Sequence, residues 1–353
     1  MSAAILIGYV LVPLFGVFLC VAPVVSRPTI QFGVRVPPER VAAPVIGGER
    51  HRYVWRSAVI AVAATVVVFA TGAHAPWWLS RIILVLLIAT DAGLFWWAHH
   101  SVARVKSAEG WFAGRRQTVV TDTGWRSEPA RFPAAWLLPA VAIIVATAVV
   151  GVLRYPDLPA HLDTGGGRHL ATTPASAFST LIGQLFVTGL WIILLTLAYR
   201  SRPDLDTGDP AASLRGYRRA FVLIGRAGLT LAACIDLTLA LKALRRWQIA
   251  DLPGGLVILP VALGLAGLLA VVVHAGRIRG RAGTTAAGSD RDDDRFWKAG
   301  LVYVSHDDPA LIVNARFGFA LTPNLGNPRV WLIVGGVAAV LAGLIALKLT
   351  IGL

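Results

Sequence analysis

The sequence has few charged residues and almost no cysteine. Of its 353 residues only 15% are charged and 56% are hydrophobic. Ordinary soluble domains do not have this composition, so water is excluded as the main solvent of the chain. Both cysteines, Cys20 and Cys234, lie inside apolar runs, and we expect them near opposite faces of a membrane, too far apart for a disulfide. No cysteine and histidine cluster has metal-ligand spacing, and we predict no metal and no cofactor.

The net charge of +14 does not indicate a nucleic-acid partner. The basic residues are spread through short segments between apolar runs and never gather on one soluble domain. The sequence also lacks a nucleophile paired with a base, a phosphate-binding glycine loop and a paired-carboxylate site. We therefore predict a protein that is not an enzyme and does not bind nucleic acid.

Long apolar runs are what the sequence has in abundance. A span needs about 20 mostly apolar residues, because backbone polar groups in hydrocarbon must be hydrogen-bonded within a helix. The prediction is an all-α polytopic membrane protein with eight transmembrane helices and small β elements in cytoplasmic loops. The predicted spans are Ala3–Val25, Ser57–Ala73, Ile82–Ala98, Ala134–Leu153, Phe178–Tyr199, Ala220–Leu241, Leu256–His274 and Val330–Leu349.

Lysine and arginine alternate between rich and poor segments along the chain. The rich segments are residues 27–56, 104–131, 200–219 and 277–329, and the segments between them are poor. Basic residues favour the cytoplasmic side of a membrane, so the rich segments are predicted inside. This alternation predicts a plasma-membrane protein with both its N-terminus and its C-terminus outside.

The most distinctive polar segment is the predicted outer loop, Y-P-D-L-P-A-H-L-D-T-G-G-G-R-H-L-A-T-T-P from Tyr155 to Pro174. Thr173 is a good N-cap for the next helix, and Pro174 suits its first turn. Two interpretations remain open: a small cation site at His161, Asp163 and His169, or an ordered loop that needs no ligand. The candidate ligand-binding residues are Pro156, Asp157, Pro159, His161, Asp163 and Gly165.

Two charged residues are predicted to lie deep within the spans. At about 1.5 Å rise per residue, Asp91 lies near mid-depth in the third span and Arg226 lies towards the inner side of the sixth. An isolated charge at such depth is costly, so we predict that Asp91 and Arg226 pair. The pair is either a structural contact that fixes helix register or part of a proton or ion pathway.

Short extended segments are predicted in the inner loops. Gln31–Pro37, Q-F-G-V-R-V-P, is typical of a strand, and Arg316–Pro323, R-F-G-F-A-L-T-P, is a related run. The two segments are either equivalent elements at one membrane face or a coincidence. A hairpin is predicted in Arg115–Trp125, and two strands joined by a turn at His306–Pro309 are predicted in Gly300–Asn314.

Three aspartates precede this last loop segment with the spacing of a calcium loop. They are Asp290, Asp292 and Asp294. Arg295 stands where the glycine of an EF-hand should be, and Leu301 stands where its bidentate glutamate should be. We therefore interpret the aspartates as a solvated linker and a helix start.

Two segments resemble known families. P-D-L-P-A-H-L-D-T-G-G resembles the signature of the membrane region known as domain of unknown function 1648, which also occurs in bacterial immunity proteins of the sporulation-delaying-protein system. That resemblance covers the fourth span, the outer loop and the fifth span. Phe296–Pro328 resembles a small C-terminal cytoplasmic domain often found with that region, although Ser305 and His306 depart from its usual asparagine. The residues that carry the second resemblance are Trp297, Gly300, Tyr303, Asp308, Pro309, Arg316, Gly318, Thr322 and Asn324.

These resemblances imply protection of a cell from a membrane-acting peptide and transmission of its presence to a regulator. The implied partners are the lipid bilayer, an extracellular peptide and a cytoplasmic regulator; the oligomeric state is left open. The predicted function is non-enzymatic envelope sensing or peptide immunity, and the alternative is a transporter or channel subunit using Asp91 and Arg226. The predicted regions are residues 1–133 with three spans, 134–199 with the outer loop, 200–276 with spans six and seven, 277–328 as the cytoplasmic domain, and 329–353 with the last span.

Overall fold

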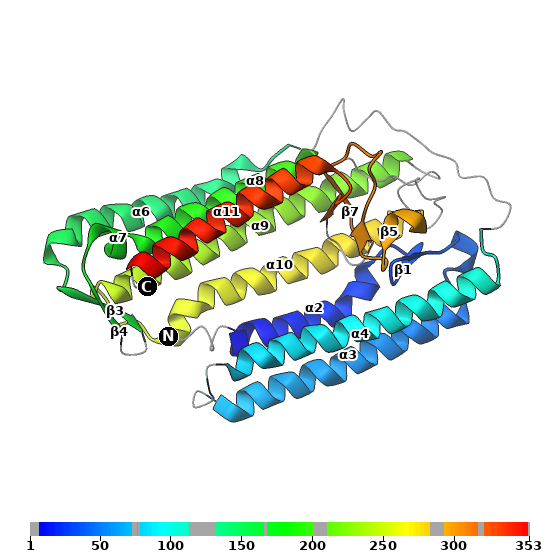
Figure 1. Cartoon of the computed structure of the whole chain (residues 1–353), viewed down its shortest axis with the longest axis horizontal. Helices are drawn as coiled ribbons and strands as arrows, with labels where there is room; N and C mark the ends of the chain where they lie inside the picture. Colours follow the sequence, from blue (N-terminus) through cyan, green and yellow to red (C-terminus); the bar gives the residue numbers. More distant parts are fainter. Residues whose placement is uncertain are drawn as a thin grey trace.

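The computed structural model describes residues 7–72, 76, 78–112, 131–165, 168–200, 210–282, 293–316 and 321–351. Long helices dominate it (Figure 1). They are α2 (Val12–Val25, preceded by the π-helical turn η1, Ile7–Leu11), α3 (Pro44–Thr71), α4 (Leu79–Ala108), α6 (Leu138–Arg154, preceded by η4, Ala134–Leu137), α8 (Ser179–Arg200), α9 (Pro210–Arg246), α10 (Gly254–Ala282) and α11 (Pro328–Ile351). Short elements are η2 (Pro38–Arg40), η5 (Tyr155–Asp157), α7 (Pro174–Ala177) and η7 (Asp294–Phe296).

Seven helical segments of the described residues are long and apolar enough to cross a bilayer. Their outward surfaces are rich in apolar side chains, such as Leu138 and Leu153, which are 68% and 71% exposed. Large exposed apolar surfaces mark contact with something other than water. The chain is therefore an all-α polytopic membrane protein. The seven segments are Gly8–Val25, Pro44–Thr71, Leu79–Ala108, Ala134–Asp157, Ser179–Tyr199, Leu214–Arg246 and Gly254–Ile278.

Several helices are longer than the apolar runs that predicted them. Helix α3 begins at Pro44, thirteen residues before the predicted span, and α4 continues ten residues past its predicted end. The predicted spans are parts of these longer helices, because hydropathy detects only the part of a helix that faces hydrocarbon. The eighth predicted span coincides with α11, in which the shorter stretch Pro328–Ala339 is apolar.

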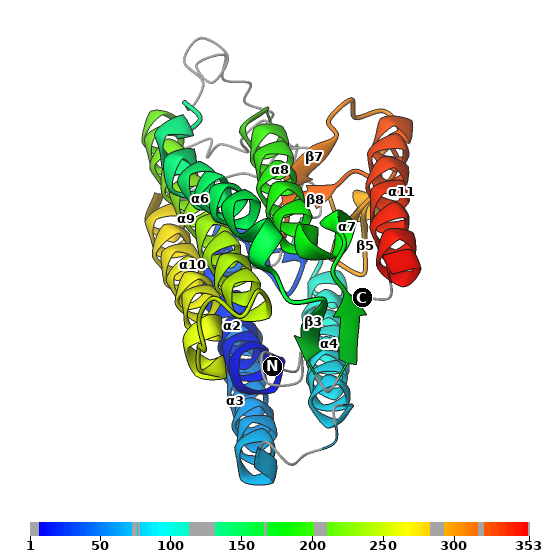
Figure 2. The same ribbon diagram turned by 90° about the vertical axis from the view of Figure 1, so that its left-hand side faces the viewer.

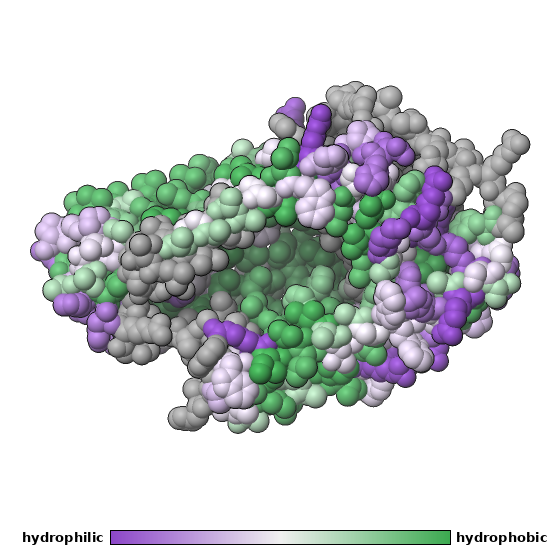
Figure 3. Space-filling model, in the orientation of Figure 1, coloured by the Kyte–Doolittle hydropathy of each residue, from purple (hydrophilic) through white to green (hydrophobic). Residues whose placement is uncertain are grey.

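The helices form two groups joined by α10. Helices α2, α3 and α4 pack together, as do α6, α8 and α9, and α10 contacts both α9 and α2 (Figure 1). Helix α11 stands apart from α8 (Figure 2). Hydrophobic side chains cover the helices, whereas hydrophilic ones gather mainly at the end that carries β1 and β5 (Figure 3).

Four antiparallel two-stranded sheets lie in the connections. One prediction about them is wrong. The segment from Gln31 to Pro37 is part of a hairpin, not one strand, because Phe32 and Gly33 both have positive φ, 48° and 74°, and turn the chain back. Two strands, Val302–Tyr303 and Ile312–Asn314, do lie on either side of the turn predicted at His306–Pro309, and they belong to different sheets. The strand pairs are β1 (Ile30–Gln31) with β2 (Val34–Arg35), β3 (His161–Gly165) with β4 (Arg168–Ala171), β5 (Trp297–Lys298) with β6 (Val302–Tyr303), and β7 (Ile312–Asn314) with β8 (Leu321–Pro323).

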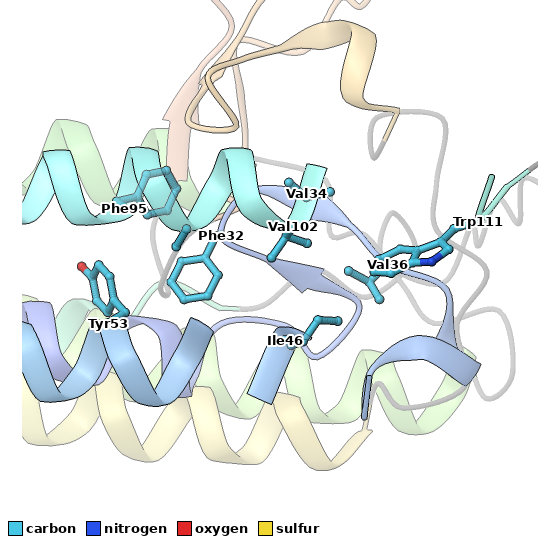
Figure 4. Packing of buried hydrophobic residues seen from close by; sticks show 9 residues of the cluster. Phe32, Val34, Val36, Ile46, Tyr53, Phe95, Val102 and Trp111 are labelled. Carbon is cyan, nitrogen blue, oxygen red and sulfur yellow. The ribbon is translucent and has the colours of Figure 1, made fainter. Parts of the chain in front are cut away.

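An apolar cluster fixes the β1–β2 hairpin between α3 and α4. Phe32 is 2% exposed and lies edge-on to the rings of Tyr53 from α3 and Phe95 from α4 (Figure 4). Val34 and Val36 continue the cluster towards Trp111, beyond the end of α4. Burial of these side chains holds the turn of the hairpin in one position.

Candidate functional site

Asp294, at the start of η7, is the centre of a polar junction between distant parts of the chain. Its Oδ2 accepts a hydrogen bond from Lys106 Nζ of α4 at 2.6 Å. Its Oδ1 accepts from Arg316 Nη1 at 2.5 Å and from the backbone N–H of Arg35 in β2 at 3.3 Å. We call residues 293–327 the C-terminal module. The partly exposed carboxylate of Asp294 therefore joins this module to the β1–β2 hairpin and to α4.

The charges around Asp294 set its protonation. Burial alone raises the pKa of this carboxyl, but the positive charges of Arg316 and Lys106 and their hydrogen bonds outweigh burial. The net result is a pKa below the ordinary value. Asp294 is therefore ionised at neutral pH. Asp294 begins the short helix η7, as the interpretation of a helix start requires, but it is not a solvated linker residue, because its carboxylate bonds to Lys106, Arg316 and Arg35. Asp290 and Asp292 lie outside the described residues.

Arg316 is a fully buried cation in this junction, with a side-chain exposure of 0%. Besides Asp294, its Nη1 donates to the backbone oxygen of Gly33 at 2.7 Å. Its guanidinium carbon lies 4.9 Å from the centre of the Trp297 ring. A buried cation needs such compensation. Thus Arg316, a predicted site residue, binds the Phe32–Gly33 turn of the other related sequence segment and lies against Trp297, a second predicted site residue.

Two glycines permit the closest backbone contact of the junction. Gly33 and Gly300 both have positive φ, 74° and 69°. A Cβ on Gly33 would lie 2.6 Å from the Gly300 Cα, and a Cβ on Gly300 would lie 2.8 Å from His99 Nδ1. His99 Nδ1 itself lies 2.8 Å from the Phe32 oxygen, a contact that requires the proton on Nδ1. We call this assembly of Gly33, His99, Lys106, Asp294, Gly300 and Arg316 the hairpin–module junction.

The remaining predicted residues of the module hold its loops together. Asn324 is 0% exposed; its Oδ1 accepts from the backbone N–H of Ser305 at 3.0 Å, and its Nδ2 donates to the backbone oxygens of Ser305 and Asp308 at 2.8 and 3.0 Å. Asp308 Oδ2 accepts from the Tyr303 hydroxyl at 3.0 Å. The Pro309 backbone oxygen accepts from Asn327 Nδ2 at 3.2 Å. These contacts are structural. Gly318 lies outside the described residues, as does the hairpin predicted in Arg115–Trp125.

The predicted outer loop forms the β3–β4 hairpin, and the buried Leu162 of this hairpin packs on the helices. Leu162 is 0% exposed and contacts Ala243 and Trp247 at the end of α9. Its neighbours His161 and Asp163 are exposed, as alternation along a strand requires. Asp163 pairs in register with His169 across the hairpin. Gly165 ends β3.

Prolines and hydroxyls fix the two ends of this hairpin. Pro156 and Asp157 lie in the single turn η5, and the Pro159 backbone oxygen accepts from the Thr172 hydroxyl. The predicted cap at Thr173 is confirmed: its Oγ1 accepts from the backbone N–H of Ser176 at 3.2 Å, and Ser176 Oγ accepts in return at 2.9 Å. No group of three or more metal-ligating side chains is found in the described part of the chain.

The predicted pairing of Asp91 with Arg226 is wrong. Asp91, 4% exposed, accepts a hydrogen bond from the Tyr53 hydroxyl at Oδ2 and one from the Ser57 hydroxyl at Oδ1 at 2.5 Å. Arg226 is exposed on α9, with its guanidinium carbon 5.7 Å from the centre of the Trp136 ring. The two residues belong to different helix groups (Figure 1). Sequence depth places both in the bilayer but does not tell which helices are neighbours.

No family model, no curated protein and no solved structure matches this chain. The chemistry of its polar clusters must therefore carry any functional argument. The hairpin–module junction fastens one loop to another through charge and close backbone contact, and it offers no nucleophile next to a base among these residues. Such an arrangement suits a docking contact that can open and close.

Proposed function

We propose that the chain spans the plasma membrane eight times, with α11 as the eighth span and both termini outside. The alternation of basic segments supports this topology, because it assigns the β3–β4 hairpin to the outer face and the hairpin–module junction to the inner face. The seven long apolar helices and the apolar start of α11 are compatible with it.

Within this topology we infer a non-enzymatic function in envelope sensing or immunity to a membrane-acting peptide. The β3–β4 hairpin receives the peptide, and the C-terminal module passes the signal to a cytoplasmic regulator. The inference is based on one observation: a series of packed helices connects the β3–β4 hairpin with the C-terminal module. Coupling between distant sites travels through such contacts when the packed elements have two arrangements.

The connection begins where Leu162 of the hairpin packs on Ala243 of α9. Helix α9 then packs on α10, where a Cβ on Gly264 would lie 2.9 Å from the Cys234 Cβ. Near its other end α10 packs on α2, where a Cβ on Gly276 would lie 2.6 Å from Val25 Cβ. Val25 ends α2, five residues before β1 and the hairpin–module junction. A displacement at the β3–β4 hairpin therefore has a packed route to the module.

The alternative function, a transporter or channel subunit, was based on an Asp91–Arg226 pair, whereas Asp91 bonds to Tyr53 and Ser57 and Arg226 lies near Trp136. The family resemblances stay predictions. They agree with a sensing or immunity function, and the packing route is independent of them.

A deletion strain tests the function. We expect loss of the gene to raise sensitivity to at least one member of a panel of membrane-acting peptides, measured as the minimal inhibitory concentration. The wild-type gene should restore resistance, whereas Gly264→Leu should not, because its side chain would separate α9 from α10.

Gly267→Leu is the matched control on the same helix, because a Cβ there meets nothing within 4 Å. It should restore resistance at equal membrane abundance. Unchanged sensitivity of the deletion strain across the panel would overturn the proposed function. Full rescue by Gly264→Leu would overturn the packing route alone.

Cysteine labelling tests the topology separately. His161→Cys and Asp251→Cys should react with a membrane-impermeant maleimide in whole cells. Ser107→Cys and Asp307→Cys should react only after the cells are permeabilised. All four positions are exposed, so a lack of labelling reflects sidedness and not burial.

A further inference from the structure

A second buried carboxylate lies in the other helix group, at Asp236 of α9. Asp236 is 0% exposed, and its Oδ2 accepts a hydrogen bond from the Thr188 hydroxyl of α8 at 2.6 Å. Gln184, one helical turn before Thr188, is also 0% exposed. Its Nε2 donates to the Asp236 backbone oxygen at 2.8 Å and to Thr147 Oγ1 of α6 at 3.2 Å. Three helices thus contribute to one enclosed polar cluster.

This cluster contains oxygen atoms that lack a partner. Asp236 Oδ1 and Gln184 Oε1 are both buried without a hydrogen bond. The hydroxyl of Thr180, one turn before Gln184, is likewise buried without a partner. An unpaired carboxylate oxygen in an apolar surrounding is costly, whereas both carboxylate oxygens of Asp91 are bonded. Asp236 therefore differs from Asp91 in keeping one carboxylate oxygen without a partner.

The orientation of the Gln184 amide follows from its partners. The Asp236 backbone oxygen carries no hydrogen, so the atom of Gln184 that faces it must be the amide nitrogen. The Thr147 hydroxyl already donates to the Ile143 backbone oxygen at 2.8 Å, so it accepts from the same amide nitrogen. The amide oxygen is consequently the unpaired atom of Gln184, and not the nitrogen.

The groups that face Asp236 are uncharged. Gln184 and Thr188 of α8 bond to it, and Thr147 of α6 bonds to Gln184 in turn. The thiol of Cys234, on the same helix, faces Gly264 of α10. No ion pair to Asp236 is formed by the described residues. The unpaired atoms are electron-rich acceptors, which attract a cation and repel an anion.

We propose that Asp236 and Gln184 form an intramembrane site for a small monovalent cation, a proton or a sodium ion. The carboxylate supplies the charge that neutralises the ion, and the amide oxygen supplies a neutral ligand. The site lies ten residues from the α9 end that carries Arg246, about 15 Å along the helix, and near the contact of α9 with Leu162. This inference is independent of the proposed sensing function.

Thermal unfolding of the full chain in lipid nanodiscs tests the site. A cation that binds only the folded state stabilises it by RT ln(1 + c/Kd), where c is the free cation concentration. At pH 8, replacing N-methylglucamine chloride by NaCl at equal ionic strength should raise the Tm by roughly 2 °C or more at tenfold excess over Kd. If the ion is a proton, sodium has no effect and the Tm rises instead as the pH falls from 8 to 5. A rise in Tm with sodium or with falling pH indicates a cation site at Asp236 if the Asp236→Asn variant lacks that rise.

Asp91→Asn is the matched control, because Asp91 is buried in the other helix group with both oxygens bonded. It should keep the wild-type response to sodium and to pH. If Asp236→Asn does not fold, Gln184→Met decides: loss of the amide oxygen should raise the half-saturating cation concentration about tenfold. A wild-type chain without either response, an Asp236→Asn chain with the full response, or an unchanged half-saturating concentration in Gln184→Met would each overturn the site.

Discussion

The β1–β2 hairpin and the β3–β4 hairpin are held to the protein by different forces. The β1–β2 hairpin meets the C-terminal module through a buried cation at Arg316, a carboxylate at Asp294 and a backbone contact between two glycines. The β3–β4 hairpin is held by the buried side chain of Leu162 together with backbone and hydroxyl hydrogen bonds, and its Asp163 is attracted by Arg246 of α9. A contact based on charge and close fit depends on pH and tolerates little change of shape. An apolar contact is insensitive to pH and loses stability in proportion to the area removed.

This difference suits the two functions we propose. A receiving element must keep its position while its exposed residues, such as His161 and Asp163, meet a ligand. A transmitting element must release its partner when a moderate free energy is applied. Contacts that involve partly exposed charges and tight turns allow the module to separate from the hairpin, because a small displacement breaks several such contacts at once.

The largest effect is expected from Gly33→Ala. An alanine at positive φ costs about 1–2 kcal/mol, and its Cβ would meet the Gly300 backbone. Separation of the hairpin from the module would also break the hydrogen bond from Arg316, worth about 1.5–3 kcal/mol. We expect the junction to open, measured as a longer distance between spin labels at Ser107→Cys and Asp307→Cys.

Gly47→Ala provides the control for this substitution. Gly47 lies in the first turn of α3, where a Cβ meets nothing within 4 Å. The label distance should stay at its wild-type value, and α3 should gain about 0.5–1 kcal/mol of helix propensity. An unchanged distance in Gly33→Ala would show that close backbone contact does not hold the junction.

Leu162→Ala should destabilise the β3–β4 hairpin by about 3 kcal/mol, the usual cost of truncating a fully buried leucine. Proteolysis of the hairpin should become faster, while the label distance at the hairpin–module junction stays unchanged. Leu153→Ala, on the outward surface of α6, is the control and should leave the hairpin protected. Equal proteolysis of both variants would contradict the apolar anchoring of the hairpin.

The helical fold could be predicted from the sequence because bilayer thickness fixes the length of an apolar run. The contacts between helices could not. Asp91 was expected to meet Arg226 because both lie within apolar runs, but its partners Tyr53 and Ser57 are hydroxyl groups on the neighbouring helix α3. Hydroxyls at a helix surface leave no distinct pattern in a sequence, although two at a spacing of four share a face.

The contacts of the hairpin–module junction also could not be predicted from the sequence. The sequence relates the segment around Phe32 and Gly33 to the one that begins at Arg316, and the structure brings these two segments into contact. Their sequence similarity does not imply this contact, because Arg316 and Gly33 are 283 residues apart. Asp294 was missed for a further reason: its role comes from two basic residues supplied by other segments. In the β3–β4 hairpin, by contrast, the cap at Thr173 is local and was predicted correctly.

The smallest expected change is a loss of stability of the hairpin–module junction at low pH. It distinguishes the β1–β2 hairpin from the β3–β4 hairpin, where no such loss is expected. The pKa of Asp294 lies below its ordinary value of about 3.9, so the unfolded chain takes up a proton before the junction does. The stabilisation is therefore complete above about pH 4 and is lost as the pH falls through the folded pKa. Because the carboxylate is 39% exposed, we expect a loss of about 1 kcal/mol at most. The label distance at the junction should lengthen below pH 4 in the wild type, and proteolysis at the Leu162 contact should not change over this pH range.

In Asp294→Asn the label distance should be longer at every pH and should not lengthen further in acid. A lengthening of wild-type size below pH 4 in that variant would assign the titration to another group.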